Sequence, residues 1–172
     1  MISAILLIPL FLIRYGLLSV LDKGALPRAA FFTPMHGLEK TMFWIYQLST
    51  LAIMVNMFFL RIKTEAFLFG IGFAMYVVGV LLFTMSVVSF AKPAINGINQ
   101  AGLYRFSRNP MYVAYFIYFL SCSLMTQSTI LFVFVCIFQI SAHWIILSEE
   151  RWCINQFGEE YKRYMKKVGR YV

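Results

Sequence analysis

Charged residues are scarce in this chain of 172 residues, where they make up 13% of the sequence against 61% for hydrophobic residues. A soluble domain usually carries about 25% charged residues, so the side chains needed to cover a water-facing surface are missing. This scarcity excludes a soluble globular enzyme, and an aromatic fraction of 18% excludes a disordered chain. We therefore expect an all-α integral membrane protein that forms one domain over residues 1–172.

Cysteine and histidine are also few. The three cysteines, Cys122, Cys136 and Cys153, lack the spacing of metal ligands, and two of them fall in apolar stretches where buried thiols are expected. Two histidines, His36 and His143, are too few for a multi-histidine metal site, so we expect no metal. The formal net charge of +8 comes from basic residues between and after the apolar stretches, which favours membrane lipids over nucleic acid as partners.

Five apolar stretches predict five membrane helices. About 20 residues at ~1.5 Å each cross ~30 Å of hydrocarbon, and four of the stretches reach that length. The remaining stretch is shorter and forms a tight hairpin with the last one. The tail after the last stretch predicts an amphipathic helix at the membrane surface, with a bend at Gly158. The predicted spans are about 2–21, 42–60, 66–90, 111–126 and 129–148.

The positive residues predict the orientation of these helices. With five spans, the segments 22–41 and 91–110 and the C-terminal tail share one face and carry twelve Lys and Arg residues. The opposite face carries only Arg61 and Lys63. Because positive loops stay inside, the N-terminus is predicted outside and the tail in the cytosol. Arg14 lies inside the first span, where we expect its side chain to extend to the headgroups.

The last span carries a polar stripe. Gln139, His143 and Glu150 are separated by four and seven residues, so a 3.6-residue period places them along one side of a helix. Glu149 points about 100° away from Glu150. Ionisable residues in or beside a span are functional candidates, and the stripe ends in a carboxylate on the face predicted to be cytosolic.

The segment before the fourth span predicts a helix start with an anion site. Pro110 suits the first helical position, and Asn109 before it is expected to be extended and to cap free backbone N–H groups. Arg108 then lies beside the positive end of the helix. A guanidinium next to unpaired N–H groups favours binding of a carboxylate or a phosphate.

The ordered motifs of residues 98–172 resemble those of the integral-membrane methyltransferases, namely the isoprenylcysteine carboxyl methyltransferases and the related phospholipid N-methyltransferases. The pattern is Gly-x-Tyr-x-x-x-Arg-x-Pro-x-Tyr, a helical hairpin, Glu-Glu, Phe-Gly-x-x-Tyr-x-x-Tyr and Val-x-Arg-Tyr. The matching residues are Gly102, Tyr104, Arg108, Pro110, Tyr112, Glu149, Glu150, Phe157, Gly158, Tyr161, Tyr164, Val168, Arg170 and Tyr171.

This resemblance implies S-adenosylmethionine as the methyl donor and a lipophilic acceptor that enters from the bilayer. Since a carboxylate acceptor needs no general base, we favour a prenylcysteine-type carboxylate held bidentately by Arg108. The alternative is a lipid amine, for which Glu150 is the expected base. The predicted catalytic residues are Arg108 and Glu150. The predicted cofactor-binding residues are Gly102, Leu103, Tyr104, Pro110, Tyr112, His143, Glu149 and Glu150.

Two other functions fit parts of the pattern. Membrane sterol reductases, which use a nicotinamide cofactor, have a similar C-terminal pattern but are generally longer. A structural or transport subunit would leave Arg108 and the Glu149–Glu150 pair without a role. Within the methyltransferases, many isoprenylcysteine enzymes carry His before the motif proline, whereas this chain has Asn109, as phospholipid-type relatives often do.

Overall fold

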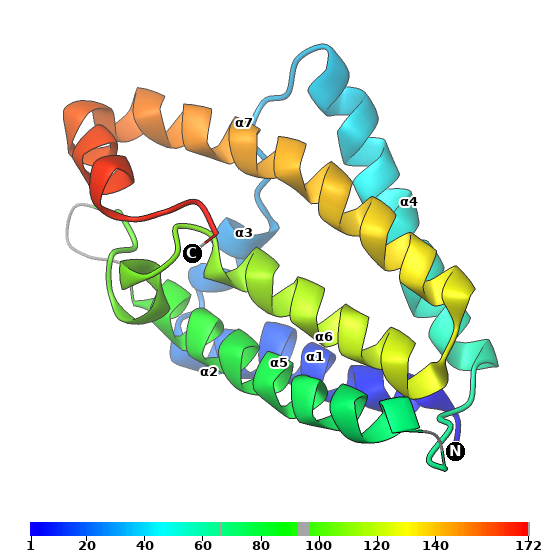
Figure 1. Ribbon diagram of the computed structural model, residues 1–172. Coiled ribbons are helices and arrows are strands. Elements are labelled where there is room, and N and C mark those ends of the chain that lie inside the picture. Colours follow the sequence, from blue (N-terminus) through cyan, green and yellow to red (C-terminus); the bar gives the residue numbers. More distant parts are fainter. Residues whose placement is uncertain (66, 93–96, 172) are drawn as a thin grey trace.

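The computed structural model describes residues 1–65, 67–92 and 97–171, and these residues form a bundle of helices (Figure 1). The chain begins with consecutive helical turns of different kinds, continues through one short and two long helices, and ends in a hairpin of two helices. In chain order the elements are the 3-10 helix η1 (Ser3–Leu7), α1 (Ile8–Phe11), the π-helix η2 (Leu12–Leu17), α2 (Leu18–Leu21), α3 (Ala25–Ala30), α4 (Leu38–Phe59), α5 (Phe67–Ala91), the 3-10 helix η3 (Gly102–Arg105), α6 (Pro110–Thr126) and α7 (Thr129–Lys167).

Within the described residues, four helical segments are long and apolar enough to cross a membrane, namely Ser3–Leu21, α4, α5 and α7. Helix α6 is apolar but has only 17 residues. The prediction of an all-α membrane protein with a short fourth helix is therefore confirmed. One boundary differs, because α4 begins at Leu38 rather than near residue 42. Helix α7 extends to Lys167 and so includes both the predicted span 129–148 and the predicted tail helix.

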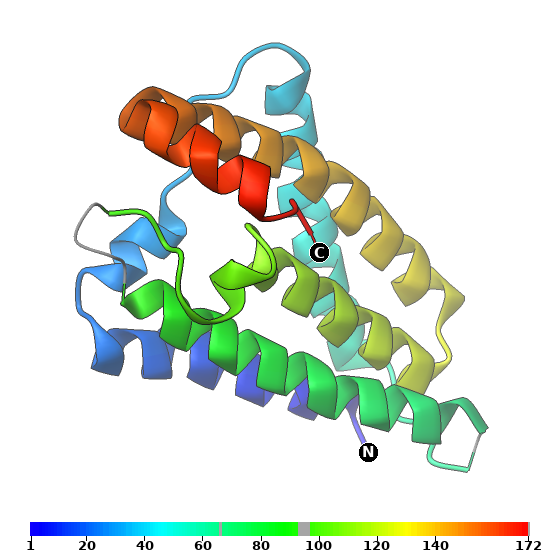
Figure 2. The same cartoon turned by 60° about the vertical axis from the view of Figure 1, so that its left-hand side comes forward.

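The long helices pack in pairs, α5 along α6 and α4 along α7, and the first span lies beside α5 (Figures 1 and 2). Aromatic side chains fill the space between them. Phe83 of α5 contacts Tyr115 of α6 with ring centres 4.7 Å apart, and Tyr46 of α4 stacks on Phe138 of α7 at 5.0 Å. These contacts hold together the ends of four helices around the site described below.

Helix α7 changes direction at Gly158, where φ is 53° and ψ is −130°. Glycine adopts this conformation readily, whereas a side chain would strain it. The last part of the helix folds back, and the segment after it returns to the start of α6 (Figure 2). There the backbone N–H of Arg108 donates to the carbonyl of Gly169 at 3.0 Å. The bend predicted at Gly158 is confirmed, and it brings the C-terminal segment to the motif around Arg108.

Candidate active site

A buried cluster of charges joins the start of α6, the middle of α7 and the segment after α7. Arg108 Nη2 lies 2.8 Å from Glu150 Oε1, and Arg170 Nη2 lies 2.8 Å from Glu150 Oε2. Glu150 is only 4% exposed. Burial raises the pKa of Glu150, but the hydrogen bonds from Arg170 and Arg108 outweigh it, so the pKa lies below its usual value. Glu150 is therefore a permanent anion between two cations.

The guanidinium of Arg108 makes four hydrogen bonds to the chain itself, one of them from Nη2 to Glu150. Its Nε donates to Glu150 Oε1 at 3.1 Å, and its Nη1 donates to the carbonyls of Met165 and Val168 at 3.0 and 2.8 Å. The anion that the sequence predicts beside Arg108 is thus the chain's own Glu150. A substrate carboxylate would have to displace Glu150 to bind Arg108, so the geometry gives Arg108 a positioning role.

Pro110 is the first residue of α6, as predicted, but the predicted cap by Asn109 is wrong. The Asn109 side chain makes no capping hydrogen bond, and its Nδ2 donates instead to the carbonyl of Arg170 at 3.1 Å. Ser107 Oγ donates to the same carbonyl at 3.3 Å. The side chains of Asn109 and Ser107 therefore bond to the C-terminal segment, whereas local sequence rules place such groups at the end of the helix.

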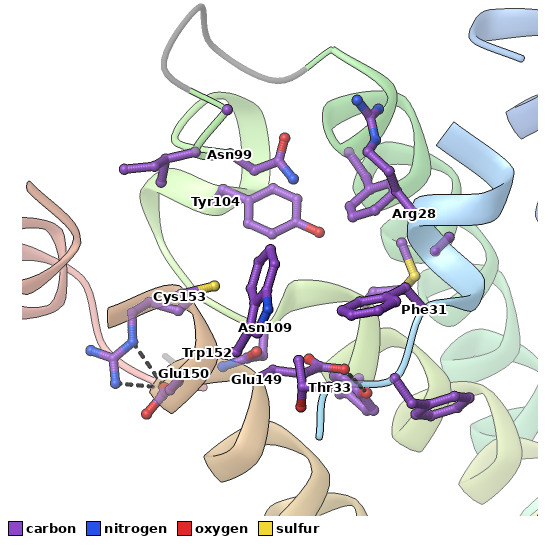
Figure 3. A pocket seen from close by; sticks show the side chains of 18 of the residues that line it. Arg28, Phe31, Thr33, Asn99, Tyr104, Asn109, Glu149, Glu150, Trp152 and Cys153 are labelled. Carbon is purple, nitrogen blue, oxygen red and sulfur yellow. Dashed lines mark hydrogen bonds and ion pairs between the residues drawn. The ribbon is translucent and has the colours of Figure 1, made fainter. Parts of the chain in front are cut away.

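A cavity of about 710 Å³ lies next to this cluster (Figure 3). It is bounded by the first span, α3 and the loop after it, α4, the end of α5, the loop before η3, the start of α6, and α7. Most of its wall is aromatic or aliphatic. Its lining includes Arg14, Phe31, Asn99, Tyr104, Tyr112, Glu149 and Trp152, and Arg108 and Glu150 border it as well.

Glu149 faces this cavity and forms no ion pair with any cation among the described residues. Its Oε1 accepts a hydrogen bond from the Tyr112 hydroxyl at 2.8 Å. The residue lies just past the predicted span, where burial raises its pKa to about 7 despite the hydrogen bond from Tyr112. A group with this pKa exchanges a proton near neutral pH, so Glu149 has the property expected of a general base.

Asn99 and Tyr104 form another polar part of the cavity wall. Asn99 Oδ1 is buried and has no hydrogen-bond partner among the described residues. Figure 3 shows the Asn99 amide beside the Tyr104 ring, with the Tyr104 hydroxyl directed towards the middle of the cavity. A buried acceptor without a donor is costly, and a ligand that carries an N–H or O–H group would satisfy it.

The structure brings five of the predicted site residues to the cavity and leaves the others elsewhere. Tyr104, Arg108, Tyr112, Glu149 and Glu150 are in its lining. Gly102, Leu103, Pro110 and His143 are not among the described residues that line it.

Two of the four residues outside the lining have contacts of a structural kind. Gly102 has a φ of 58°, and a Cβ there would collide with Ser89. His143 Nδ1 lies 2.7 Å from the hydroxyl of Tyr171. The cofactor-binding assignments of these residues stay predictions.

The polar stripe on α7 has the geometry that the sequence predicts, but it faces the C-terminal segment. His143 and Glu150 share one side, where both contact the C-terminal segment through Tyr171 and Arg170. Glu149 points away from that side, as expected, and this direction leads into the cavity. Helical spacing gives the angle between two side chains but not the side on which a ligand cavity lies.

Several cavity residues have no signal in the sequence motifs. Phe31 and Thr33 come from the loop between α3 and α4, where Phe31 packs on Trp152 with ring centres 5.7 Å apart and the Thr33 hydroxyl lies 2.8 Å from that of Ser148. A loop has no periodic pattern that would place it. The unpaired Arg14 inside a span was the one available sign that the N-terminal half contributes to the site.

Helices of membrane-spanning length around a partly open cavity, with a carboxylate in its wall, are typical of an integral-membrane enzyme. The comparison with protein families makes this class specific. The sequence model of the phospholipid methyltransferase family matches residues 64–160, more than half of the chain, so the chain belongs to this family of membrane methyltransferases. No curated protein matches the chain.

The matched residues run from the start of α5 to the kink in α7. They include Arg108, Tyr112, Glu149 and Glu150, so the cavity carboxylate and the Arg108–Glu150 pair belong to the family region, whereas Arg170 lies after it. Members of the family generally use S-adenosylmethionine as the methyl donor. The first span, α3 and α4, which complete the cavity, lie outside the matched residues.

Proposed function

We propose that this protein transfers a methyl group from S-adenosylmethionine to the head group of a lipid amine, within the cavity beside Glu149. The observation that carries the proposal is the environment of Glu149, a half-buried carboxylate with a pKa of about 7 that faces the cavity and has no cationic partner within ion-pair distance among the described residues. The membrane location follows from the family and from the four candidate spans.

The cavity residues fit the methyl donor. A volume of about 710 Å³ lies within the range of ~300–1,000 Å³ usual for ligand pockets. Trp152 and Phe31 offer aromatic surface for a purine, and the unpaired Asn99 Oδ1 offers an acceptor for an amino group or a hydroxyl group. Glu149 supplies negative charge, which favours a donor that carries a positively charged sulfur.

When bound, the cofactor supplies an activated methyl group, and the protein has to position and prepare the acceptor. A lipid amine is protonated at neutral pH and must lose a proton before it can attack. Glu149 lines the cavity and is half-ionised near pH 7, so it accepts this proton, while Tyr112 holds one of its oxygens in place. The apolar wall excludes water from the reacting groups.

A prenylcysteine-type carboxylate is the second candidate acceptor. Arg108, which the sequence assigns to holding it, is engaged with Glu150. The observation that favours this candidate is Arg14, a guanidinium that also lines the cavity and has no acidic partner among the described residues. A carboxylate acceptor is already ionised and makes no use of Glu149 as a base.

Purified protein in detergent tests the cofactor, and vesicles test the acceptor. We expect S-adenosylhomocysteine to bind in titration calorimetry and a nicotinamide dinucleotide not to bind. In vesicles that contain phosphatidylethanolamine or a farnesylated cysteine, we expect methyl transfer to the amine lipid, measured by mass spectrometry. Binding of the dinucleotide alone would overturn the proposal in favour of a reductase, and methylation of the cysteine alone would replace the acceptor.

The cofactor is cytosolic, and we propose that the cavity opens on the cytosolic face, as the distribution of positive residues predicts. A cysteine introduced at Gly169 should react with an impermeant thiol reagent only from the cytosolic side. Labelling from the opposite side alone would contradict the predicted orientation.

A further inference from the structure

Arg14 of the first span turns into the cavity. Its Nη2 donates to the carbonyl of Ala29 at 2.6 Å, and its Nη1 lies 3.2 Å from Met111 Sδ. The sequence predicts that the Arg14 side chain extends to the headgroups. In the structure it lines the cavity instead. A cation inside a membrane span is costly, and it normally faces an internal partner or a functional cavity.

The partners of Arg14 are neutral, unlike those of the other arginines around the cavity. Arg108 and Arg170 share Glu150, and Arg28 pairs with Asp22. Among the salt bridges of the described residues, none includes Arg14. A guanidinium whose partners among the described residues are a carbonyl, a thioether and the Tyr115 hydroxyl has donors left for an anion that is not part of the chain.

The backbone around Arg14 is also unusual. Residues Leu12–Leu17 form a π-helix in the middle of an otherwise tighter helical span. Such turns are rare in proteins as a whole, but many of those that occur lie at functional sites. They interrupt the regular hydrogen-bond ladder of the helix. This unfavourable π-helical turn therefore lies at the position from which Arg14 reaches the cavity.

Arg14 and Glu149 give the cavity one group of each sign. They come from the first span and from α7, both line the cavity, and no ion pair joins them in the described part of the chain. The positive charge of Arg14 still acts on Glu149 across the space between them. Opposite charges held apart in this way are suited to a head group that carries an amine and an oxyanion.

We propose that Arg14 binds the oxyanion of the acceptor lipid, a phosphate or a carboxylate, and so positions the head group for methylation, an inference that rests on the proposed function. A guanidinium suits both anions because its planar fork forms two parallel hydrogen bonds. The acceptor rather than the methyl donor is the expected partner, because Arg14 belongs to a membrane span and the acceptor arrives from the bilayer.

A binding experiment tests this subsite without methyl transfer. Titrations of dodecyl phosphate, dodecanoate and dodecanol into the full-length protein in a neutral maltoside detergent would compare the wild type with Arg14→Gln, Arg14→Lys and the control Arg105→Gln, which removes an exposed charge outside the cavity lining. We expect Arg14→Gln to weaken binding of the two anions about 10- to 100-fold. Dodecanol binding and the control should be unchanged.

Arg14→Lys keeps the charge without the fork, so an intermediate loss is expected, and this variant decides the matter if Arg14→Gln does not fold. Equal weakening of dodecanol would show that Arg14 only maintains the cavity. Unchanged binding of both anions in both variants would overturn the proposal.

A kinetic experiment distinguishes the two sources of the oxyanion and the two ligands of the site. In vesicles, Arg14→Gln should raise KM for the accepted lipid about tenfold or more with a smaller change in kcat. The lipid with the affected KM, phosphate-bearing or carboxylate-bearing, identifies the oxyanion. The Kd of S-adenosylhomocysteine should not change, and a loss there would assign Arg14 to the donor and overturn the proposal. If the wild type methylates neither lipid, the proposed function fails while the binding of dodecyl phosphate still decides the role of Arg14.

Discussion

Glu149 and Glu150 are neighbours in the chain but lie in opposite surroundings. Glu150 is held by two guanidinium groups, which together lower its pKa although burial acts in the other direction. Glu149 is held by one neutral hydroxyl, so burial prevails and its pKa rises to about 7. The difference teaches that the partners of a carboxylate, acting against its burial, decide whether it stabilises the fold or is free to exchange a proton.

Substitution of the paired carboxylate should have the largest effect on stability. Glu150→Gln leaves Arg108 and Arg170 without their counterion in a buried place, and removal of one partner from such a cluster costs about 3–5 kcal/mol. The free energy of unfolding, measured in detergent with a denaturant, should fall by about this amount. The matched Glu149→Gln variant should be no less stable than the wild type. Equal stability of both variants would remove the distinction between the two residues.

Substitution of the cavity carboxylate should mainly affect the rate. Glu149→Gln cannot accept a proton, so we expect kcat for methylation of an amine lipid to fall about 100-fold, the lower part of the range for loss of a general base. Steady-state kinetics in vesicles would measure it. A carboxylate acceptor should be affected much less, and a kcat within twofold of the wild type on the amine would exclude Glu149 as the base.

Arg108, which contacts Glu150 and also lines the cavity, offers a third comparison. Arg108→Lys keeps the charge but loses the fork that contacts Glu150, Met165 and Val168, so we expect a loss of about 1.5–3 kcal/mol in the free energy of unfolding. Arg105→Lys, at an exposed position of the same loop, should have no measurable effect. Equal losses in both variants would show that only the charge of the loop matters.

The pH dependence of the reaction separates the two carboxylates without relying on stability. Because the base form of Glu149 increases as the pH rises through its pKa of about 7, kcat for an amine lipid should rise about tenfold from pH 5.5 to 6.5 and level off above pH 8. Glu150 is ionised throughout this window, since its pKa lies below the usual value. A rate that does not change with pH, or that falls as the pH rises, would contradict the role of Glu149.

The smallest effect is expected from Tyr112. Its hydroxyl donates to Glu149 and lowers the carboxyl pKa, so Tyr112→Phe should raise that pKa and move the pH–rate profile to higher pH by about 0.5–1 unit. The plateau rate at high pH should change little. A shift to lower pH would mean that the hydroxyl stabilises the protonated form instead.

Local rules were sufficient for the helices and for the relative directions of their side chains. The apolar stretches, the proline that begins α6 and the angular separation of Glu149 from Glu150 all follow from spacing and from the chemistry of single residues. Gly158 indicated the kink because few other residues adopt its backbone conformation.

The partners across the cavity could not be predicted in this way. Arg170 reaches Glu150 only because the chain folds back after Gly158, and the same fold brings the carbonyls of Met165 and Val168 to Arg108, the residue that the sequence assigned to substrate. Phe31 and Thr33 belong to a loop without periodicity. Arg14 was visible as an unusual cation, but its direction depends on a π-helical turn that no sequence pattern marks.

The length of α6 has a consequence for the surrounding membrane. Its 17 residues cover about 25 Å, less than the ~30 Å of a typical hydrocarbon layer, and the backbone of Lys63 on the far loop bonds to Met125 near its end. Every residue of α6 is buried or half-buried, and its neighbours α5 and α7 are long enough to cross the hydrocarbon layer, so these two helices separate it from much of the lipid. A helix shielded in this way can be shorter than the bilayer while the surrounding lipids avoid most of the mismatch, which otherwise costs fractions of a kcal/mol per ångström.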